Sequence, residues 1–347
     1  MAPIRPPALR PATTIAVCAP AGPPDPYRLA RGIDVLRRRY QVRFDESLLD
    51  AGSPRLSFGY LAGPDDQRAE ELTAALTDPS VSAIFVARGG YGSMRLIEIF
   101  DRKLIAAHPK PIIGFSDATI LLHWWLESGV VSIHGPVVTQ LGSMDRSELD
   151  HLWRLLEDPD YQPTYQGQAL TERDRQTIAL PCMAGKNPKV PGPGDEREIL
   201  EGRLWGGNLT MLSSRSGWCK PPSGPTIAIF EDLAEAPYRL DRMVTQLHLS
   251  GQLGPVLAAA LGTFSPPAQP TRTPAARPPD DPPHAGRSQP DLARIVACRL
   301  AELGKPSVMN MPWGHVGKNQ AVALGLSARL NQRDGTLTCT ESAVSSR

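Results

Sequence analysis

The chain has 347 residues, long enough for two domains that each bury a substantial core. Its 37 Lys and Arg against 36 Asp and Glu give no electrostatic reason to expect a nucleic-acid or membrane-surface partner. The five cysteines are scattered and none forms a C-x-x-C pair, which argues against a disulfide framework or a zinc site, so we expect no metal or other cofactor. The first apolar run ends at Pro20, too short for a signal peptide or a membrane span, and we predict a cytoplasmic protein.

In the first part of the chain, short apolar strands alternate with amphipathic helices. The expected strands cover 13–20, 41–44, 81–87, the stretch before Ser116, and 130–133, and the expected helices cover 27–39, 65–76, 94–100 and the stretch after Ser116. Such alternation predicts an α/β domain with a parallel, Rossmann-like sheet covered by helices on both faces. Ligands of such sheets bind at the carboxyl ends of the strands.

Composition then divides the chain. We expect a flexible N-terminus at 1–12, an N-terminal α/β domain at 13–157, an interdomain linker at 158–199 with a short strand at 177–180, and a C-terminal domain at 200–347. Residues 264–290 hold nine of the 36 prolines and almost no large apolar side chains, which predicts a disordered surface insertion. Binding through a proline motif is the alternative for this insertion.

The second domain mixes the two kinds of strand pairing. Strands are expected at 225–230, 256–261 and 307–311, and helices at 238–249 and 292–303. The last two apolar stretches, 320–330 and 336–340, are joined by Arg333-Asp334-Gly335, which is a hairpin signal. We therefore predict a mixed α/β domain with antiparallel, barrel-like β-structure.

Ser116 stands at the turn of a strand–turn–helix stretch, in the pattern G-x-S-x-A formed with Gly114 and Ala118. A serine exposed on such a turn needs small residues two positions away on either side, because the turn is sharp and strained. The following helix would direct its N-terminal amides at a developing oxyanion. Alternatively, Ser116 and Asp117 simply cap that helix.

Two further loops follow predicted strands. Arg88-Gly89-Gly90-Tyr91-Gly92 brings three glycines into four residues, which allows backbone amides to approach an anion or an oxyanion. A phosphate loop without the Walker lysine and an ordinary tight turn are the alternatives. His134 follows the last strand of the first domain, where it is either a base or a structural residue.

Glu231 and His315 also stand at the ends of predicted elements, in the second domain. A serine hydroxyl needs a base to take its proton, an imidazole suits that task, and a carboxylate fixes the imidazole tautomer. The order Ser, acid, His is one of several that unrelated hydrolases use. If Ser116, Glu231 and His315 meet, the site lies in the cleft between the domains.

The chain resembles the LD-carboxypeptidase family of muramoyltetrapeptide carboxypeptidases and microcin C self-immunity peptidases. The matching segments are GYLAG (59–63) with Asp65 and Arg68, IFVARGGYGSMRL (84–96), PIIGFSDAT (111–119), HGP (134–136), LWGGNL (204–209), FED (230–232), PYRLDRM (237–243) and Gly314-His315. The resemblance implies a serine peptidase with a triad of Ser116, Glu231 and His315, and it favours Glu231 over Asp232 as the acid. It also implies a homodimer.

By the same resemblance, the substrate is an amide bond between an L-centre and a C-terminal D-residue, with D-alanine released from murein tetrapeptides in cell-wall recycling. The oxyanion donors are expected among the amides of Gly89, Gly90 and Asp117. Predicted substrate-binding residues are Arg88, Tyr91, Trp205, Asn208 and Arg239. Arg88, Arg239 and Arg242 suit carboxylates, although structural ion pairs are an equal alternative for each. Trp205 and Trp313 stack on a nucleoside or pack the domain interface, and packing is favoured.

Two alternative functions stay open at this point. One keeps the triad but cleaves peptidyl or aminoacyl nucleotides, as the immunity-type members of the family do. The other is a non-catalytic binding protein on the same fold, against which the presence of all three residues, Ser116, Glu231 and His315, argues.

Overall fold

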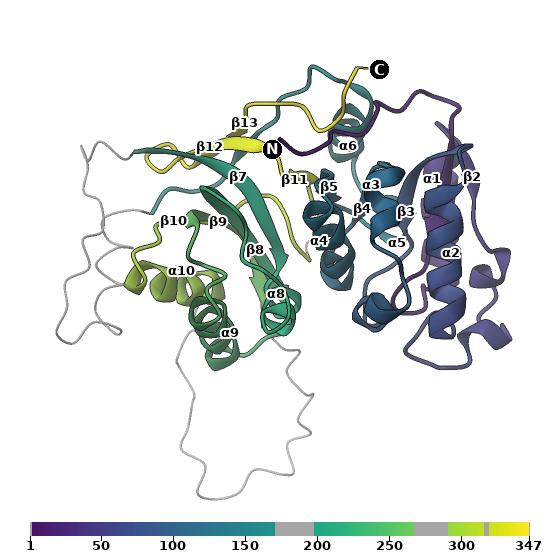
Figure 1. Ribbon diagram of the computed structural model, residues 1–347, viewed down its shortest axis with the longest axis horizontal. Helices are drawn as coiled ribbons and strands as arrows, with labels where there is room; N and C mark the ends of the chain where they lie inside the picture. Colours follow the sequence, from purple (N-terminus) through teal and green to yellow (C-terminus); the bar gives the residue numbers. More distant parts are fainter. Residues whose placement is uncertain (1, 171–197, 267–290, 316–318, 347) are drawn as a thin grey trace, which may run out of the picture.

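The computed structural model describes residues 2–170, 198–266, 291–315 and 319–346. Figure 1 shows two α/β halves side by side, each built around its own sheet. The expected strand at 177–180 and the Pro-rich stretch at 267–290 lie outside the described residues, so nothing is said of their structure.

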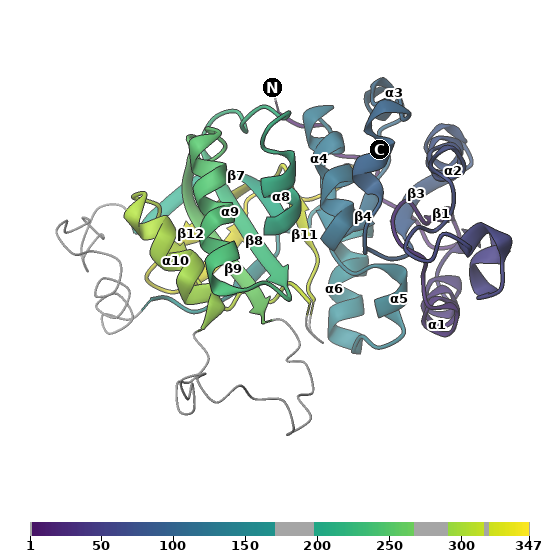
Figure 2. The same cartoon turned by 90° about the horizontal axis from the view of Figure 1, so that it is seen from below.

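The first half is built on a sheet whose strands run in the order β11-β5-β4-β3-β1-β2, and β1 to β5 pair in parallel. Figure 2 shows α2, α3 and α4 on one face of this sheet and α1, α5 and α6 on the other. The elements are β1 (Thr14–Cys18), α1 (Pro26–Arg37), β2 (Gln41–Arg43), two 3-10 turns, η1 (Glu46–Leu49) and η2 (Pro54–Leu56), then α2 (Asp65–Thr77), β3 (Val81–Val86), η3 (Ser93–Glu98), α3 (Lys103–Ala107), β4 (Ile112–Gly114), η4 (Ser116–Ala118), α4 (Thr119–Glu127), β5 (Ser132–His134), α5 (Val138–Leu141) and α6 (Arg146–Glu157). Alternating apolar strands and amphipathic helices give this arrangement, as predicted, although the segment expected as a helix at 94–100 is a 3-10 helix.

The second sheet has the order β10-β9-β8-β7-β12-β13-β6. Its elements are β6 (Thr164–Gln166), β7 (Ile199–Asn208), α8 (Leu209–Arg215), β8 (Thr226–Leu233), α9 (Pro237–Leu249), β9 (Val256–Ser265), α10 (Leu292–Glu302), β10 (Ser307–Val308), β12 (Ser327–Asn331) and β13 (Thr336–Cys339). Strands β7 to β10 pair in parallel, whereas β12, β13 and β6 pair antiparallel. An antiparallel bridge between Gln168 and Met309 joins the segments that follow the two edge strands, so the sheet curls toward closure. The predicted fold class is confirmed.

One predicted strand is wrong. The stretch 320–330 does not form a single strand, because the chain turns at Gly325, whose φ is +92°. Only β12, after the turn, enters the hairpin with β13. The part before the turn, β11 (Val322–Leu324), crosses to the first sheet and pairs antiparallel with β5. The second half of the chain therefore contributes a strand to the first sheet, and this strand pairs directly with His134.

Segments outside the two predicted domains also make defined contacts. In the segment 2–12, expected to be flexible, the backbone N–H of Leu9 donates to the carbonyl of Leu156 at 2.8 Å. Leu9 itself is buried. Strand β6, which lies within the predicted linker 158–199, pairs with β13. The domain boundaries themselves stay predictions.

Candidate active site

Ser116 occupies a strained turn directly after β4. Its φ is +60°, a region that non-glycine residues rarely adopt and that costs free energy wherever it is held. A Cβ at Gly114 would lie 2.9 Å from the Ala118 Cβ, so the chain can turn here only with a glycine two residues before the serine. Neither η4 nor α4 has a side-chain cap, so Ser116 does not act as the capping residue that the sequence left open.

The glycine turn after β3 lies against this serine. A Cβ at Gly89 would be 2.9 Å from the Ser116 Cβ and 3.1 Å from its Oγ, which means that the Gly89 backbone faces the hydroxyl directly. The carbonyl of Gly89 accepts a hydrogen bond from the Gly22 N–H at 3.0 Å. Gly90 has a φ of +104°. These glycines are needed because a side chain at 89 would displace Ser116, and one at 90 would strain the backbone.

Asp117 joins the two loops. Its carboxylate is buried and accepts a hydrogen bond from the backbone N–H of Ser93, the first residue of η3, at 2.8 Å. Burial raises the pKa of this carboxyl above its usual value. The side chain therefore fixes the glycine turn to the serine turn, while the backbone N–H of Asp117 belongs to the turn itself.

Glu231 and His315 form a hydrogen-bonded pair in the second half. The distance between Nδ1 of His315 and Oε2 of Glu231 is 2.8 Å. Glu231 is fully buried near the end of β8, whereas the His315 side chain keeps 16% of its surface exposed. The preceding Gly314 has a φ of +123°, and a Cβ there would lie 2.3 Å from Thr263 Oγ1, so glycine sets the position of the imidazole. The N–H of Gly314 donates to Oδ1 of Asn319 at 3.1 Å.

The pair lies against the serine turn of the first half. The His315 ring is 4.6 Å from the ring of Phe115, the residue before Ser116. Close by, the backbone N–H of Asn208 donates to Thr119 Oγ1, in the first turn of α4, at 3.2 Å. No hydrogen bond joins Ser116 to His315 in the described part of the chain. Sequence reasoning had no signal for Phe115 as the contact between the halves.

The carboxylate of Asp232, the alternative acid, is hydrogen-bonded to Asn208 and Thr210 and not to His315. Its carboxylate accepts hydrogen bonds from Asn208 Nδ2 at 3.0 Å and from the N–H and hydroxyl of Thr210 at 2.9 and 2.8 Å. Burial is the main cause that raises its pKa to about 6. Asn208 is itself buried and caps α8, since its Oδ1 accepts from the Met211 N–H at 3.1 Å. Of the two acids, only Glu231 contacts the histidine.

The other predicted substrate-binding residues are spread over the surface and the core. Tyr91 is 49% exposed and its ring lies 6.1 Å from that of Tyr60. Arg88 is exposed, and one of its terminal nitrogens donates to the carbonyl of Pro23 at 2.7 Å. Arg239 is exposed on α9 and forms an ion pair with Glu235 at 3.5 Å.

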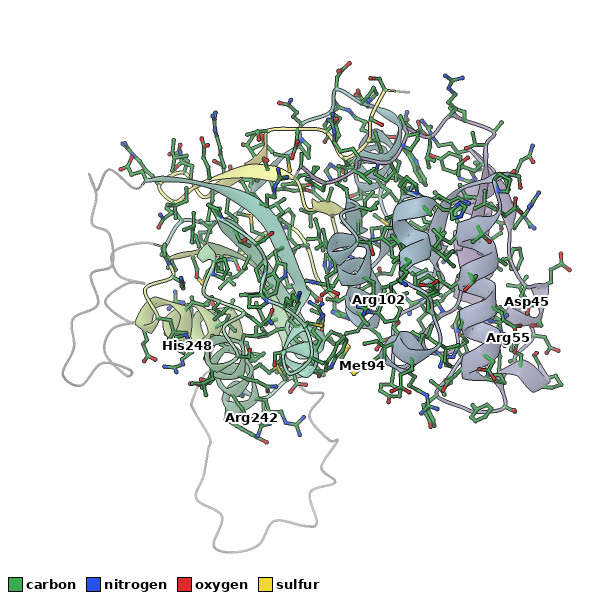
Figure 3. The ribbon with its side chains drawn as sticks, in the orientation of Figure 1. Asp45, Arg55, Met94, Arg102, Arg242 and His248 are labelled. Carbon is green, nitrogen blue, oxygen red and sulfur yellow. The ribbon has the colours of Figure 1, made fainter. Side chains whose placement is uncertain are left out.

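Trp205, one of the predicted substrate-binding residues, and Trp313 both lie in the protein interior. Trp205 is 6% exposed and makes edge contacts with the rings of His123 and Phe230, and Trp313 is fully buried. Figure 3 shows Arg242 on α9 away from the first half, whereas Met94 lies where the two halves face each other.

His134 is buried beside the site. Its ring makes an edge contact with Phe115, with 6.0 Å between centroids, and neither ring nitrogen has a hydrogen-bond partner among the described residues. Burial lowers its pKa to about 4, so the ring is neutral at physiological pH. Its position behind Phe115 favours the structural interpretation over that of a base.

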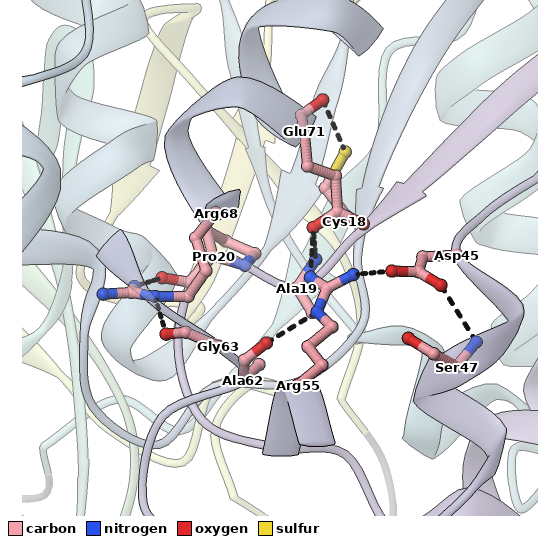
Figure 4. A network of polar contacts seen from close by, with 10 residues as sticks. All are labelled: Cys18, Ala19, Pro20, Asp45, Ser47, Arg55, Ala62, Gly63, Arg68 and Glu71. Atoms are coloured by element: carbon pink, nitrogen blue, oxygen red, sulfur yellow. Dashed lines mark hydrogen bonds and ion pairs between the residues drawn. The ribbon is translucent and has the colours of Figure 1, made fainter. Parts of the chain in front are cut away.

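Two buried arginines hold the loops around the serine turn (Figure 4). Arg68 on α2 donates to the carbonyl of Gly63 at 3.1 Å and to that of Pro20. It also donates to the carbonyl of Gly92 at 3.0 Å. Arg55 donates to the Ala62 carbonyl at 2.7 Å and pairs with Glu71. The loop after β1 and the glycine turn after β3 are thus fixed to one another through Arg68. The sequence indicated Arg68 only through a motif, because a buried arginine has no periodic signature.

Both halves of the chain match known domains. Residues 15–135 match the N-terminal domain of LD-carboxypeptidases, and residues 201–330 match their C-terminal domain. The chain belongs to the LD-carboxypeptidase family. The murein tetrapeptide carboxypeptidase of Pseudomonas aeruginosa is 32% identical over 277 residues, which cover 79% of this chain and 80% of that protein.

Solved structures agree on the fold. The muramoyltetrapeptide carboxypeptidase from Oxalobacter formigenes has a TM-score of 0.70 at 28% identity, with 94% of this chain and 97% of that one covered. A structure of MccF with glutamyl sulfamoyl guanosine has a TM-score of 0.73 at 21% identity, covers 99% and 100% of the two chains, and supports the fold alone.

Neither a cluster of metal ligands nor a membrane-spanning helix occurs in the described residues. No group of three or more His, Cys, Asp or Glu side chains is arranged to hold a metal ion. No helix in that part of the chain is long and apolar enough to cross a membrane.

Proposed function

We propose that this protein is a serine-type LD-carboxypeptidase that releases D-alanine from murein tetrapeptides. The observation that carries the proposal is the hydrogen-bonded Glu231–His315 pair, packed on Phe115 next to the strained Ser116 turn. Membership of the family and the similarity to murein tetrapeptide carboxypeptidases support the substrate class.

In the proposed mechanism, Ser116 Oγ attacks the carbonyl carbon of the scissile amide and His315 Nε2 takes its proton. Glu231 accepts the Nδ1 hydrogen of His315, which fixes the tautomer and stabilises the imidazolium. The imidazolium then protonates the leaving D-alanine nitrogen, and water resolves the acyl-enzyme by the same steps. Substrate binding is proposed to bring Nε2 of His315 and Oγ of Ser116 into hydrogen-bonding distance, since catalytic hydrogen bonds often tighten only in the complex.

The oxyanion donors are proposed to be the backbone N–H groups of Gly90 and Asp117. The carbonyl of Gly89 points at Gly22, and in a trans peptide the following N–H points the opposite way, so the Gly90 N–H is directed away from Gly22. The Gly89 backbone lies against the Ser116 hydroxyl. Together these contacts support a role for the turn in holding the tetrahedral oxyanion.

Cleavage of peptidyl or aminoacyl nucleotides is the second candidate, since the self-immunity protein MccF of Escherichia coli is 25% identical over 258 residues, which cover 70% of this chain and 72% of that one. Trp205 and Trp313 are buried and offer no open ring face for a nucleobase, which favours the murein substrate. A non-catalytic binding role would leave the strained Ser116 turn without a purpose.

The test is hydrolysis of L-Ala-γ-D-Glu-meso-diaminopimelate-D-Ala by the wild type and by Ser116→Ala, with an aminoacyl sulfamoyl nucleotide assayed in parallel. We expect D-alanine release by the wild type only. Release by both proteins would remove Ser116 as the nucleophile, and cleavage of the nucleotide alone would replace the murein assignment with the MccF-like one.

A cytoplasmic location, expected from the short first apolar run, and a homodimer, which the family resemblance implies, are also proposed. Light scattering coupled to size exclusion tests the second, with a mass of twice 37.6 kDa expected.

A further inference from the structure

A pocket of about 480 Å³ opens beside the glycine turn of the first half. It lies between the loop after β1, which supplies Pro23 and Asp25, and Arg88, which follows β3. In this sheet β1 pairs with β2 on one side and β3 on the other, so the pocket is at the point where the strand order reverses. Ligands of open parallel sheets bind at such a point, outside the carboxyl ends of the strands.

The segment Arg88-Gly89 borders both the pocket and Ser116. Arg88 lines the pocket, and the next residue, Gly89, would place a Cβ 3.1 Å from Ser116 Oγ. Gly22, which precedes the pocket prolines, donates to the Gly89 carbonyl at 3.0 Å. Consecutive Cα atoms are about 3.8 Å apart, so the pocket wall begins within about one residue of the reacting centre.

The lining combines apolar walls with opposite charges. Prolines, Ala51 and Leu56 provide the walls, while Arg28, Arg88 and Asp25 provide two guanidinium groups and one carboxylate. All three charged residues are exposed. Arg88 directs one donor to the Pro23 carbonyl, and no hydrogen bond or ion pair occupies the Arg28 guanidinium in the described part of the chain. Two cations and one anion around an apolar slot suit a ligand with an aliphatic stem that ends in both a carboxylate and an ammonium.

We propose that this pocket binds the free amino-acid end of the residue before the scissile bond, that is, the distal carboxylate and ammonium of diaminopimelate. The inference rests on the proposed function, since the stem must run from an acyl group held at Ser116. From the scissile carbonyl carbon to the distal centre, five bonds span roughly 6 Å, which fits a pocket that starts beside Gly89. Arg28 and Arg88 then contact the carboxylate, and Asp25 contacts the ammonium. These residues determine specificity and take no part in the bond-breaking step.

Two tetrapeptides separate this role from a structural one. One tetrapeptide contains meso-diaminopimelate, and the other contains L-lysine at the same position. Lysine keeps the aliphatic stem and the ammonium group but lacks the distal carboxylate. The variants are Arg28→Gln, Asp25→Asn and the control Arg38→Gln, which removes an exposed arginine just past the other end of α1. Asp25→Asn keeps an oxygen that caps α1, where Asp25 now accepts from the Arg28 N–H at 2.8 Å, so the helix is retained.

We expect the wild type to prefer the diaminopimelate peptide by about tenfold or more in kcat/KM, the effect of one charge-assisted hydrogen-bonded pair. Arg28→Gln should abolish most of that preference while it leaves the lysine peptide within about twofold, and Asp25→Asn should slow both peptides. Arg38→Gln should change neither. The subsite is overturned if the wild type has the same kcat/KM for both peptides, or if Arg28→Gln lowers kcat/KM equally for both. In either case, release of D-alanine still supports the proposed function. Absence of release from either peptide overturns the function and the subsite together.

Discussion

At the scale of single residues, the site depends on backbone positions that tolerate no side chain. Gly89 is not among the residues with a positive φ, yet a Cβ there would lie 2.9 Å from the Ser116 Cβ. We predict that Gly89→Ala displaces the nucleophile and lowers kcat by about 100-fold, comparable to the loss of an oxyanion donor, with little change in the free energy of unfolding. The matched control is Gly217→Ala, because a Cβ at Gly217 meets no atom within 4 Å. Equal activity of Gly89→Ala and the control would show that the glycine turn does not border the reacting serine.

His134 gives the site a pH-dependent contribution to stability. Its pKa is about 4 in the folded protein against about 6.5 when unfolded, so below pH 6.5 the unfolded chain takes up a proton that the folded chain does not. The free energy of unfolding therefore falls as pH decreases from 6.5 toward 4. We predict that His134→Gln removes about 2 kcal/mol of the loss that the wild type suffers between pH 7.5 and pH 5, measured by urea unfolding. Parallel curves for the two proteins would mean that His134 titrates normally.

The sequence suggests candidates for the triad, whose roles stay proposals, but it does not predict the residues that they contact. Ser116 is recognisable because its steric requirements fall at fixed spacing, two residues on either side. Phe115, Arg68 and the pairing of Asp232 with Asn208 have no local signature, since each depends on contacts between segments more than twenty residues apart. Asn208 was predicted to bind substrate from a motif alone.

At the scale of elements, α8 is fixed by Asn208 at its N-terminus. The side chain caps the helix and also bonds the buried Asp232. We predict that Asn208→Ala lowers the free energy of unfolding by about 2–4 kcal/mol, roughly one for the lost cap and the rest for the weakened hydrogen bonding of the buried carboxylate. KM should stay within about twofold.

The outcome decides between two roles for this residue. A large rise in KM without loss of stability would restore Asn208 as a substrate-binding residue. The control is the exposed Ser214, later in the same helix, whose hydroxyl donates only to the Thr210 carbonyl one turn earlier. Ser214→Ala should therefore change neither the free energy of unfolding nor KM by much.

The boundaries of β3 were predictable, because its apolar run ends at polar turns, whereas the strand expected at 225–230 extends as β8 to Leu233. The division of the stretch 320–330 was not predictable, because it depends on the tertiary partner of each part, β5 for β11 and β7 for β12. A glycine within an apolar stretch, here Gly325, is the one local sign of such a break.

At the scale of the whole molecule, the crossing of β11 ties the two halves together through a shared sheet. The first sheet needs a strand from near the C-terminus, and Pro7 pairs with Ser345. We therefore predict a single urea transition, with tryptophan fluorescence and far-ultraviolet circular dichroism coincident, although each half carries its own tryptophans, such as Trp124 and Trp205. Two separated transitions would mean that the halves fold independently in spite of the crossing strand.

The central claim is that Ser116 of one half is activated by the Glu231–His315 pair of the other. Its most direct test is fluorophosphonate labelling read by intact mass and peptide mapping, on the wild type, Ser116→Ala, His315→Ala and Glu231→Gln. We predict labelling of the wild type on Ser116 with one group per chain, none on Ser116→Ala, and labelling slowed by at least about 100-fold in His315→Ala, with Glu231→Gln also slowed. Labelling of His315→Ala at the wild-type rate would contradict the account.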